Sequence, residues 1–218
     1  AWLQRRQQGE PVAYLLGKRE FWSLPLTVTP ATLIPRPETE LLIECALELS
    51  LPGDARVVDL GTGSGAIALA LAHERPHWQV TGVDVSAEAL EVARANAESL
   101  GLARVDWRLG NWLEPLGTER FSLIVSNPPY VTPDDPHLEM GDLPFEPRSA
   151  LVAGEDGFAD LRLITEAAPD HLVPEGWLML EHGFEQGEGV RDLLTRAGFE
   201  AVRSHRDLSG QERISVGR

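Results

Sequence analysis

Two short stretches of the sequence carry residues whose types and spacing could do chemistry. One is VVDLGTGSG over residues 57–65, where three glycines follow an apolar run. The other is IVSNPPYV over residues 124–131, where Asn127 precedes two prolines and Tyr130. Glycines let a backbone approach a ligand closely, whereas prolines remove N–H donors and leave carbonyl acceptors. The first stretch is typical of a ligand-binding turn, and the second of a rigid corner that accepts hydrogen bonds.

The glycine-rich stretch indicates a nucleoside ligand. Gly61, Gly63 and Gly65 join a predicted strand to a predicted helix, whose first N–H groups have no intrahelical partner. Their G-x-G-x-G spacing differs from the dinucleotide G-x-G-x-x-G pattern and from a phosphate loop. Asp59 lies two positions before Gly61, and a carboxylate there suits a cationic or amine-bearing ligand better than a pyrophosphate. Asp84 ends the next predicted strand, where an acid can accept the hydroxyls of a ribose.

A nucleoside with a cationic or amino-acid-like tail describes S-adenosylmethionine, which these features therefore predict. NAD is the main competing ligand. The alternative without any ligand is a tight strand-to-helix turn, with Asp84 near a helix N-cap.

The Asn-Pro-Pro-Tyr stretch predicts a site for a planar NH₂ group. The side-chain oxygen of Asn127 and a proline carbonyl can each accept one N–H of such a group, while Tyr130 packs on its face. An amide or arylamine nitrogen is a poor nucleophile because its lone pair is delocalised. Holding both N–H groups out of the usual plane favours a nitrogen whose lone pair points at a methyl group. The alternative is an ordinary turn with a surface tyrosine.

Strands and helices alternate from residue 55 onward. The predicted strands are 55–60, 78–84, 105–109, 121–127, 176–182, 199–207 and 212–218, and the predicted helices are 65–74, 87–101, 158–172 and 187–198. This alternation predicts a doubly wound α/β domain with a mostly parallel seven-stranded sheet and an antiparallel last strand. Ligands of such sheets bind at the carboxyl ends of the strands, which places Asn127 beside the glycine loop.

The segments outside this alternation have their own patterns. REFWSLPLTV over residues 19–28 alternates and contains Pro25, which predicts a short hairpin or edge strand. Residues 37–49 predict a helix that opens with proline and early acids. Residues 133–157 are rich in proline, glycine and acid, as expected for a lid or binding loop.

Composition narrows the classes of partner. The 218 residues include 19 Lys and Arg against 34 Asp and Glu, a formal net charge of −15, which disfavours extended nucleic acid as a partner. We expect a cytoplasmic protein without a membrane partner, because no apolar run approaches the roughly 18 to 20 residues of a membrane span. Cys45 lies in an apolar helical pattern and is expected in the core. HERPH over residues 73–77 matches a zinc-protease pattern, but Pro76 breaks the helix that this pattern needs, so no metal site is expected.

The glycine-rich and Asn-Pro-Pro-Tyr stretches together resemble class I S-adenosylmethionine methyltransferases that act on adenine N6, guanine N2 or glutamine N5. Three further stretches, residues 9–40, 110–115 and 145–164, resemble the release-factor glutamine methyltransferase family, and the resemblance covers nearly the whole chain. It implies a Rossmann-like methyltransferase fold. It also implies methyl transfer from S-adenosylmethionine, leaving S-adenosylhomocysteine, to glutamine N5 in the Gly-Gly-Gln motif of class 1 peptide chain release factors.

The resemblance also implies roles for individual residues. The implied cofactor-binding residues are Asp59, Gly61, Thr62, Gly63, Ser64, Gly65, Asp84, Asn111, Trp112 and Asn127. The implied glutamine pocket consists of Asn127, Pro128, Pro129 and Tyr130, of which Asn127, Pro128 and Tyr130 are the catalytic set. Asn111 stands where family members often have Asp, and its oxygen can still accept from adenine N6. RPETE over residues 36–40 is interpreted either as pocket wall or as a helix start.

Two domains and several rival functions complete these expectations. Residues 36–218 are interpreted as the methyltransferase domain, and residues 1–35 as a linker and β-hairpin, a candidate remnant of the helical substrate-docking domain that the family carries. The rival enzymes are a glutamine methyltransferase of a ribosomal protein, a nucleic-acid amine methyltransferase and a dinucleotide oxidoreductase. A cofactor-binding module without catalysis is the rival from another class.

Overall fold

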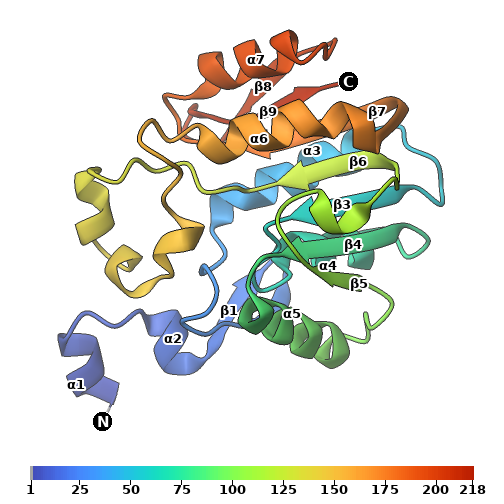
Figure 1. The fold of residues 1–218 in the computed structure, drawn as a ribbon. Coiled ribbons are helices and arrows are strands. Elements are labelled where there is room, and N and C mark those ends of the chain that lie inside the picture. The colour runs from blue at the N-terminus through green and yellow to red at the C-terminus, as the bar shows by residue number, and fades with distance from the viewer. Residues whose placement is uncertain (1) are drawn as a thin grey trace.

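A seven-stranded sheet forms the centre of the computed structural model, which describes residues 2–218 (Figure 1). Its strand order is β5-β4-β3-β6-β7-β9-β8. The strands are β3 (Arg56–Leu60), β4 (Gln79–Asp84), β5 (Asp106–Leu109), β6 (Phe121–Ser126), β7 (Leu172–Glu181), β8 (Arg203–Arg206) and β9 (Glu212–Gly217). Pairing is parallel from β5 to β7, whereas β9 runs antiparallel to both β7 and β8. The predicted doubly wound, mostly parallel sheet with an antiparallel last strand is confirmed.

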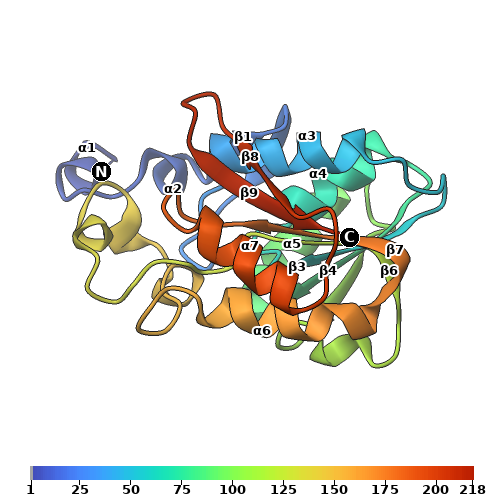
Figure 2. The same ribbon diagram turned by 90° about the horizontal axis from the view of Figure 1, so that it is seen from above.

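Helices cover both faces of the sheet, with α3 and α4 on one side and α6 and α7 on the other (Figure 2). The main helices are α3 (Glu40–Glu48), α4 (Ala66–Glu74), α5 (Ala87–Ser99), α6 (Ala159–Ala167) and α7 (Gly187–Arg196). Every residue of α4 from Ala66 to Ala72 is buried. This explains why its sequence is apolar on all sides, since a helix of that kind belongs inside a core.

The N-terminal part contains two short helices and a hairpin. Its elements are α1 (Trp2–Gln7), α2 (Val12–Leu16), β1 (Lys18–Phe21) and β2 (Leu24–Thr27). Trp22 and Ser23 form the two-residue turn with φ of 51° and 59°, as a primed hairpin turn requires. The predicted hairpin is therefore confirmed.

Asn96 of α5 ties the hairpin to the glycine loop. Its Oδ1 accepts from the backbone N–H of Thr27 at 2.8 Å, and its Nδ2 donates to the carbonyls of Thr27 at 3.0 Å and Ser64 at 2.9 Å. Phe21 and Leu26 are buried in the same core as α4. The hairpin thus packs directly on the sheet domain, and the division at residue 35 stays a prediction.

Three predicted elements have wrong boundaries, and one of them, the strand predicted over 176–182, begins earlier, at Leu172. The helix predicted over 158–172 ends at Ala167 and is followed by a 3₁₀ turn, η6 (Ala168–His171), because Pro169 has no N–H for the ladder and its ring crowds the preceding turn. The strand predicted over 199–207 is shortened to β8. Ala201 has φ of 50°, which interrupts the extended backbone.

Residues 133–157 form an irregular loop, as predicted. It contains three 3₁₀ turns, η3 (Pro136–Glu139), η4 (Leu143–Phe145) and η5 (Arg148–Ala150). The loop lies beside the N-terminal helices in both ribbon views (Figures 1 and 2). Arg36 pairs with the buried Glu146 at 2.5 Å, which fastens the loop to the segment after the hairpin. Within residues 2–218, no helix has the length and apolar character that crossing a membrane requires.

Candidate functional site

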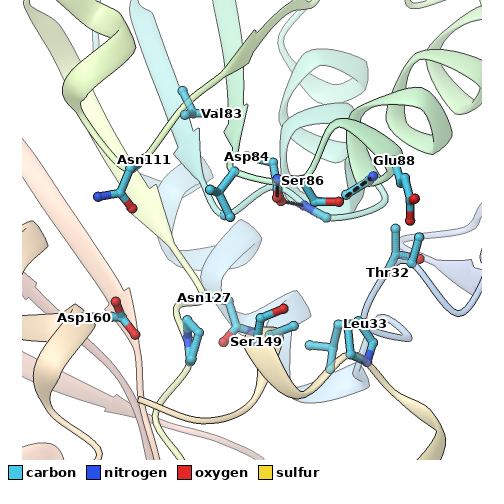
Figure 3. A pocket seen from close by; sticks show the side chains of 18 of the residues that line it. Thr32, Leu33, Val83, Asp84, Ser86, Glu88, Asn111, Asn127, Ser149 and Asp160 are labelled. Atoms are coloured by element: carbon cyan, nitrogen blue, oxygen red, sulfur yellow. Dashed lines mark hydrogen bonds between the residues drawn. The ribbon is translucent and has the colours of Figure 1, made fainter. Parts of the chain in front are cut away.

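A cavity of about 410 Å³ opens at the carboxyl ends of β3, β4 and β6 (Figure 3). Gly61 and Gly63 follow β3, Asp84 ends β4, and Asn127 follows β6, and all four line the cavity. Asp84 lies on one side of the opening and Asn127 on the other (Figure 3). This is the edge at which parallel α/β sheets bind ligands.

The turn after β3 depends on glycine at two positions. Gly61 has φ of 71°, and a Cβ there would lie 3.2 Å from Cζ3 of Trp112, whose ring covers it. Gly65 has φ of 84°, and its Cβ would meet the ring of Trp107 at 2.9 Å. The backbone N–H groups of Gly61 and Thr62 both donate to the carbonyl of Val83 at 2.9 Å, which joins the turn to the end of β4. A side chain at either glycine would displace this turn.

Asp59 holds the glycine turn in place through hydrogen bonds made inside the core. It is fully buried, and its Oδ2 accepts from the hydroxyl of Thr62 at 2.5 Å and from the backbone N–H of Ala68 at 3.2 Å. Burial raises the pKa of Asp59 to about 7, while the bonds from Thr62 and Ala68 act in the opposite direction. Thr62 and Ser64 are buried as well. Gly61 and Gly63 line the cavity, whereas Asp59 does not. Asp59 therefore affects the cavity only indirectly, by fixing the conformation of the turn.

Asp84 faces the cavity with a carboxyl group that the backbone holds in place. Its Oδ2 accepts from the N–H of Gly63 at 2.8 Å, and its Oδ1 accepts from the N–H of Ser86 at 2.9 Å. Burial raises the pKa of Asp84, and the bonds from Ser86 and Gly63 partly offset this effect. Each carboxylate oxygen can accept more than one hydrogen bond, which leaves capacity for the hydroxyls of a bound ligand.

Asn111 and Trp112 line the third side of the cavity, together with Asp160 of α6. Trp112 has φ of 45°, an unusual conformation that turns its ring over Gly61. Burial raises the pKa of Asp160, and a hydrogen bond with Trp112 opposes that effect. Asn111 is exposed, so its amide is available to a ligand.

Asn127 stands between two cavities. A second cavity of about 600 Å³ is lined by Asn127, Pro128 and Tyr130, whereas Pro129 lines the first cavity with the glycine turn. The four residues expected to form one pocket therefore divide between two. Asn127 belongs to both, which places its amide where two bound molecules would meet.

The amide of Asn127 is held from the side of α3. Its Nδ2 donates to Oγ1 of Thr39 at 3.2 Å. Thr39 belongs to RPETE, which forms the start of α3 through η1 (Pro37–Thr39) and also supplies this contact. The interpretation of RPETE as a helix start is confirmed, and Arg36 of the same stretch lines the second cavity.

The zinc-protease pattern has no helix to support it. α4 ends at Glu74, so His77 lies beyond the helix that carries His73. Among residues 2–218, no three His, Cys, Asp or Glu side chains gather as a metal site would require.

Sequence comparisons match this chain to methyltransferases. The profile described as "Methyltransferase small domain" matches residues 37–142. Release factor glutamine methyltransferase of Vibrio cholerae is 53% identical over 217 residues, which cover 99% of this chain and 76% of the relative. Release factor glutamine methyltransferase of Pseudomonas aeruginosa is 56% identical over 216 residues, which cover 99% of this chain and 78% of the relative.

The chain belongs to the release factor glutamine methyltransferase family. A solved structure from Alicyclobacillus acidocaldarius, described as a release-factor-specific protein-(glutamine-N5) methyltransferase, is 30% identical with a TM-score of 0.53. The match covers 88% of this chain and 98% of that chain. A methyltransferase from Pyrococcus furiosus, 21% identical with a TM-score of 0.67 over 99% of this chain and 96% of its own, shares the fold. The predicted family and enzyme class, a methyltransferase, are confirmed.

Several lining residues of this family member were missing from the predicted site. They are Thr32, Leu33, Ser86, Glu88, Ser149 and Asp160, most of which face the opening in Figure 3. Ser86 and Glu88 follow Asp84 at the start of α5, where the first turn of a helix after an acidic strand end is a natural place to look. Thr32 and Asp160 lie within stretches 9–40 and 145–164, which carried the family resemblance. Periodicity alone gave no signal for either residue.

Proposed function

We propose that this enzyme transfers a methyl group from S-adenosylmethionine to the side-chain N5 of the glutamine in the Gly-Gly-Gln motif of class 1 peptide chain release factors. The observation that carries the proposal is the position of Asn127, which lines both the cavity of the glycine turn and the cavity of Pro128 and Tyr130. The names of the relatives give the substrate class. The reaction belongs in the cytoplasm, where release factors act.

The first cavity fits the proposed cofactor in size and chemistry. Its volume of about 410 Å³ is within the range of small-molecule pockets, which is roughly 300 to 1,000 Å³. The carboxylate of Asp84 would accept ribose hydroxyls, and Asn111 and Trp112 would surround the adenine. Gly61 and Gly63 give the tail of the ligand close access to the backbone. When bound, S-adenosylmethionine supplies a methyl group that its sulfonium has already activated.

The second cavity fits a glutamine side chain approaching from the other side of Asn127. Oδ1 of Asn127 and the carbonyl of Pro128 would accept the two N–H groups of the glutamine amide. A glutamate would set acceptors against acceptors and leave buried groups unpaired, at a cost of about 1 to 3 kcal/mol each. The acceptors of Asn127 and Pro128 therefore favour glutamine over glutamate.

Catalysis in this arrangement depends on positioning. The glutamine nitrogen gains a methyl group and gives up one proton to water, so the site needs no strong base. Aligning the two reacting atoms at about 3 to 3.5 Å is the main contribution that a protein can make to such a transfer. The rigid Pro-Pro corner and the held amide of Asn127 are suited to that task.

Two rival substrates are separated by direct experiment. A ribosomal-protein glutamine would use the same pocket, whereas nucleic acid is disfavoured by the net charge of −15. The test incubates the enzyme with methyl-labelled S-adenosylmethionine and a class 1 release factor, a ribosomal-protein extract or total RNA. We expect label on the Gly-Gly-Gln glutamine, located by peptide mass spectrometry. Label confined to ribosomal protein or to RNA would reject the release-factor assignment.

A further inference from the structure

A buried carboxyl group lies beside Asn127 and has no part in the chemistry described above. Glu181 ends β7, which pairs in parallel with β6. Ser126 lies opposite Leu180 in this pairing, and Asn127 and Glu181 are the residues that directly follow them. Glu181 is 2% exposed, and its Oε2 is buried without a hydrogen-bond partner among residues 2–218. Burying a carboxyl group is costly, so a position beside a proposed catalytic amide calls for a functional explanation.

Thr39 connects Glu181 to Asn127. Thr39 occupies the N-cap position of α3, yet its side chain makes no capping hydrogen bond within the described part of the chain. Its hydroxyl instead accepts from Nδ2 of Asn127 at 3.2 Å. The side chains of Thr39 and Asn127 both lie close enough to the carboxyl group of Glu181 to lower its pKa. Threonine usually caps a helix at this position, but here the hydroxyl of Thr39 contacts Asn127 instead.

The charge of Glu181 decides the direction of these hydrogen bonds. An ionised carboxylate can only accept, so the hydroxyl of Thr39 must donate to it. The oxygen of Thr39 is then free to accept from Nδ2 of Asn127, as the structure shows. With Nδ2 committed to Thr39, Oδ1 of Asn127 is the atom left to accept from a substrate NH₂ group.

We propose that Glu181 is a positioning residue that fixes the orientation of the Asn127 carboxamide, acting directly and through the hydroxyl of Thr39. This inference rests on the proposed function for its consequence in catalysis. The arrangement of Glu181, Thr39 and Asn127 does not depend on which substrate is methylated, so it can be tested separately.

The proposal predicts a dependence on pH. Burial raises the pKa of Glu181 to about 7, opposed by the hydrogen bond of Thr39 and the positive charge of Arg213 on β9, while Glu38 before α3 acts in the same direction as burial. Tyr130 also faces this carboxyl group, and burial followed by the negative charge of Glu181 raises its pKa. A protonated Glu181 can donate to Thr39, whose hydroxyl then donates to Oδ1 of Asn127 and reverses the relay. Turnover should rise with pH through about 7.

Steady-state kinetics on the full chain with a release factor test the role in catalysis. Glu181→Leu and Thr39→Val are each expected to lower kcat about tenfold with little change in KM for S-adenosylmethionine. The double variant should lose little more, because both changes interrupt one relay. Glu181→Gln keeps an acceptor for Thr39, so it should retain activity at pH 8 and lose the rise in kcat between pH 6 and 8. Thr165→Val removes an equally buried hydroxyl that bonds within α6, and serves as the matched control.

Nuclear magnetic resonance tests the arrangement without any turnover. The side-chain NH₂ resonance of Asn127, identified by its loss in Asn127→Asp, is expected to shift with pH near 7 in the wild type and to stay constant in Glu181→Gln. Unchanged kcat in Glu181→Leu and Thr39→Val, or the same pH-dependent shift in Glu181→Gln, would overturn the proposal. A wild type that methylates no release factor would reject the proposed function, and the resonance would still decide the role of Glu181.

Discussion

Asn127 and Thr39 meet across the site, with Nδ2 of Asn127 3.2 Å from Oγ1 of Thr39 although 88 positions separate them in the sequence. The contact joins the end of β6 to the start of α3. With Nδ2 held there, Oδ1 is the atom of the amide left to accept from a ligand, and Asn127 lines both cavities. Acceptance of a glutamine N–H by Oδ1 of Asn127 depends on this orientation.

Removing the amide should therefore cost most of the activity. Asn127→Ala is expected to lower kcat by about a hundredfold or more, as found when one transition-state hydrogen bond is lost elsewhere. Affinity for S-adenosylmethionine should change much less, because Asp84 and the glycine turn remain. Single-turnover kinetics with a release factor measure the first effect, and calorimetry the second. A variant within threefold of the wild type would remove Asn127 from the chemistry.

Asp84 should act on cofactor affinity. Asp84→Ala removes a carboxylate that lines the cavity and also holds the N–H of Gly63 and Ser86. Hydrogen bonds to charged groups contribute about 1.5 to 3 kcal/mol, so the Kd for S-adenosylmethionine should rise roughly 10- to 100-fold. Isothermal titration calorimetry gives the value. Asp54→Ala changes an exposed acid ahead of β3 and is the control, and equal Kd values for both variants would contradict the ribose role.

Much of this site could be predicted from sequence because its residues lie at strand ends. Gly61, Asp84 and Asn127 each follow or end an apolar run, and a parallel sheet brings such ends together. Glu181 also ends a strand, but nothing in its local pattern shows that Thr39, at the start of α3, lies close to it. Contacts between distant segments depend on how α3 packs, which periodicity does not encode.

The errors in element boundaries have two different causes. Hydrophobic spacing continues through residues 158–172, yet Pro169 ends the helix early. Ala201 takes a left-handed conformation that its residue type does not suggest. The first error overlooked a local signal, the proline, whereas the second reflects a backbone conformation that hydrophobic spacing does not encode.

The glycine in the middle of β4 should be intolerant of a side chain. A Cβ at Gly82 would lie 2.4 Å from Cζ3 of Trp107, closer than real Cβ atoms approach. Gly82→Ala is expected to lower the free energy of unfolding by about 1 to 3 kcal/mol through overpacking. Gly53→Ala is the control, since its Cβ meets no atom of residues 2–218 within 4 Å. Urea unfolding that shows the same stability for both variants would contradict the packing described for Trp107.

Stability should also depend on pH through Asp59. Burial raises its pKa in the folded protein from 3.8 to about 7, so the unfolded chain releases this proton first as pH rises. The resulting contribution is fully present below about pH 4 and is lost as pH rises to about 7. Asp59→Asn should make the fall in stability between pH 5 and 8 less steep, whereas Asp54→Asn should leave it unchanged. Urea unfolding at both pH values measures this, and an equally steep fall in Asp59→Asn would show that Asp59 ionises normally.

The most direct test of the central claim is the location of the transferred methyl group. The full chain is incubated with methyl-labelled S-adenosylmethionine and a class 1 release factor, beside the same factor with Gln→Glu in its Gly-Gly-Gln motif. The account predicts a mass increase of one methyl group on the glutamine of the unchanged factor and none on the altered one. A methyl group at another residue, or equal labelling of both factors, would contradict it.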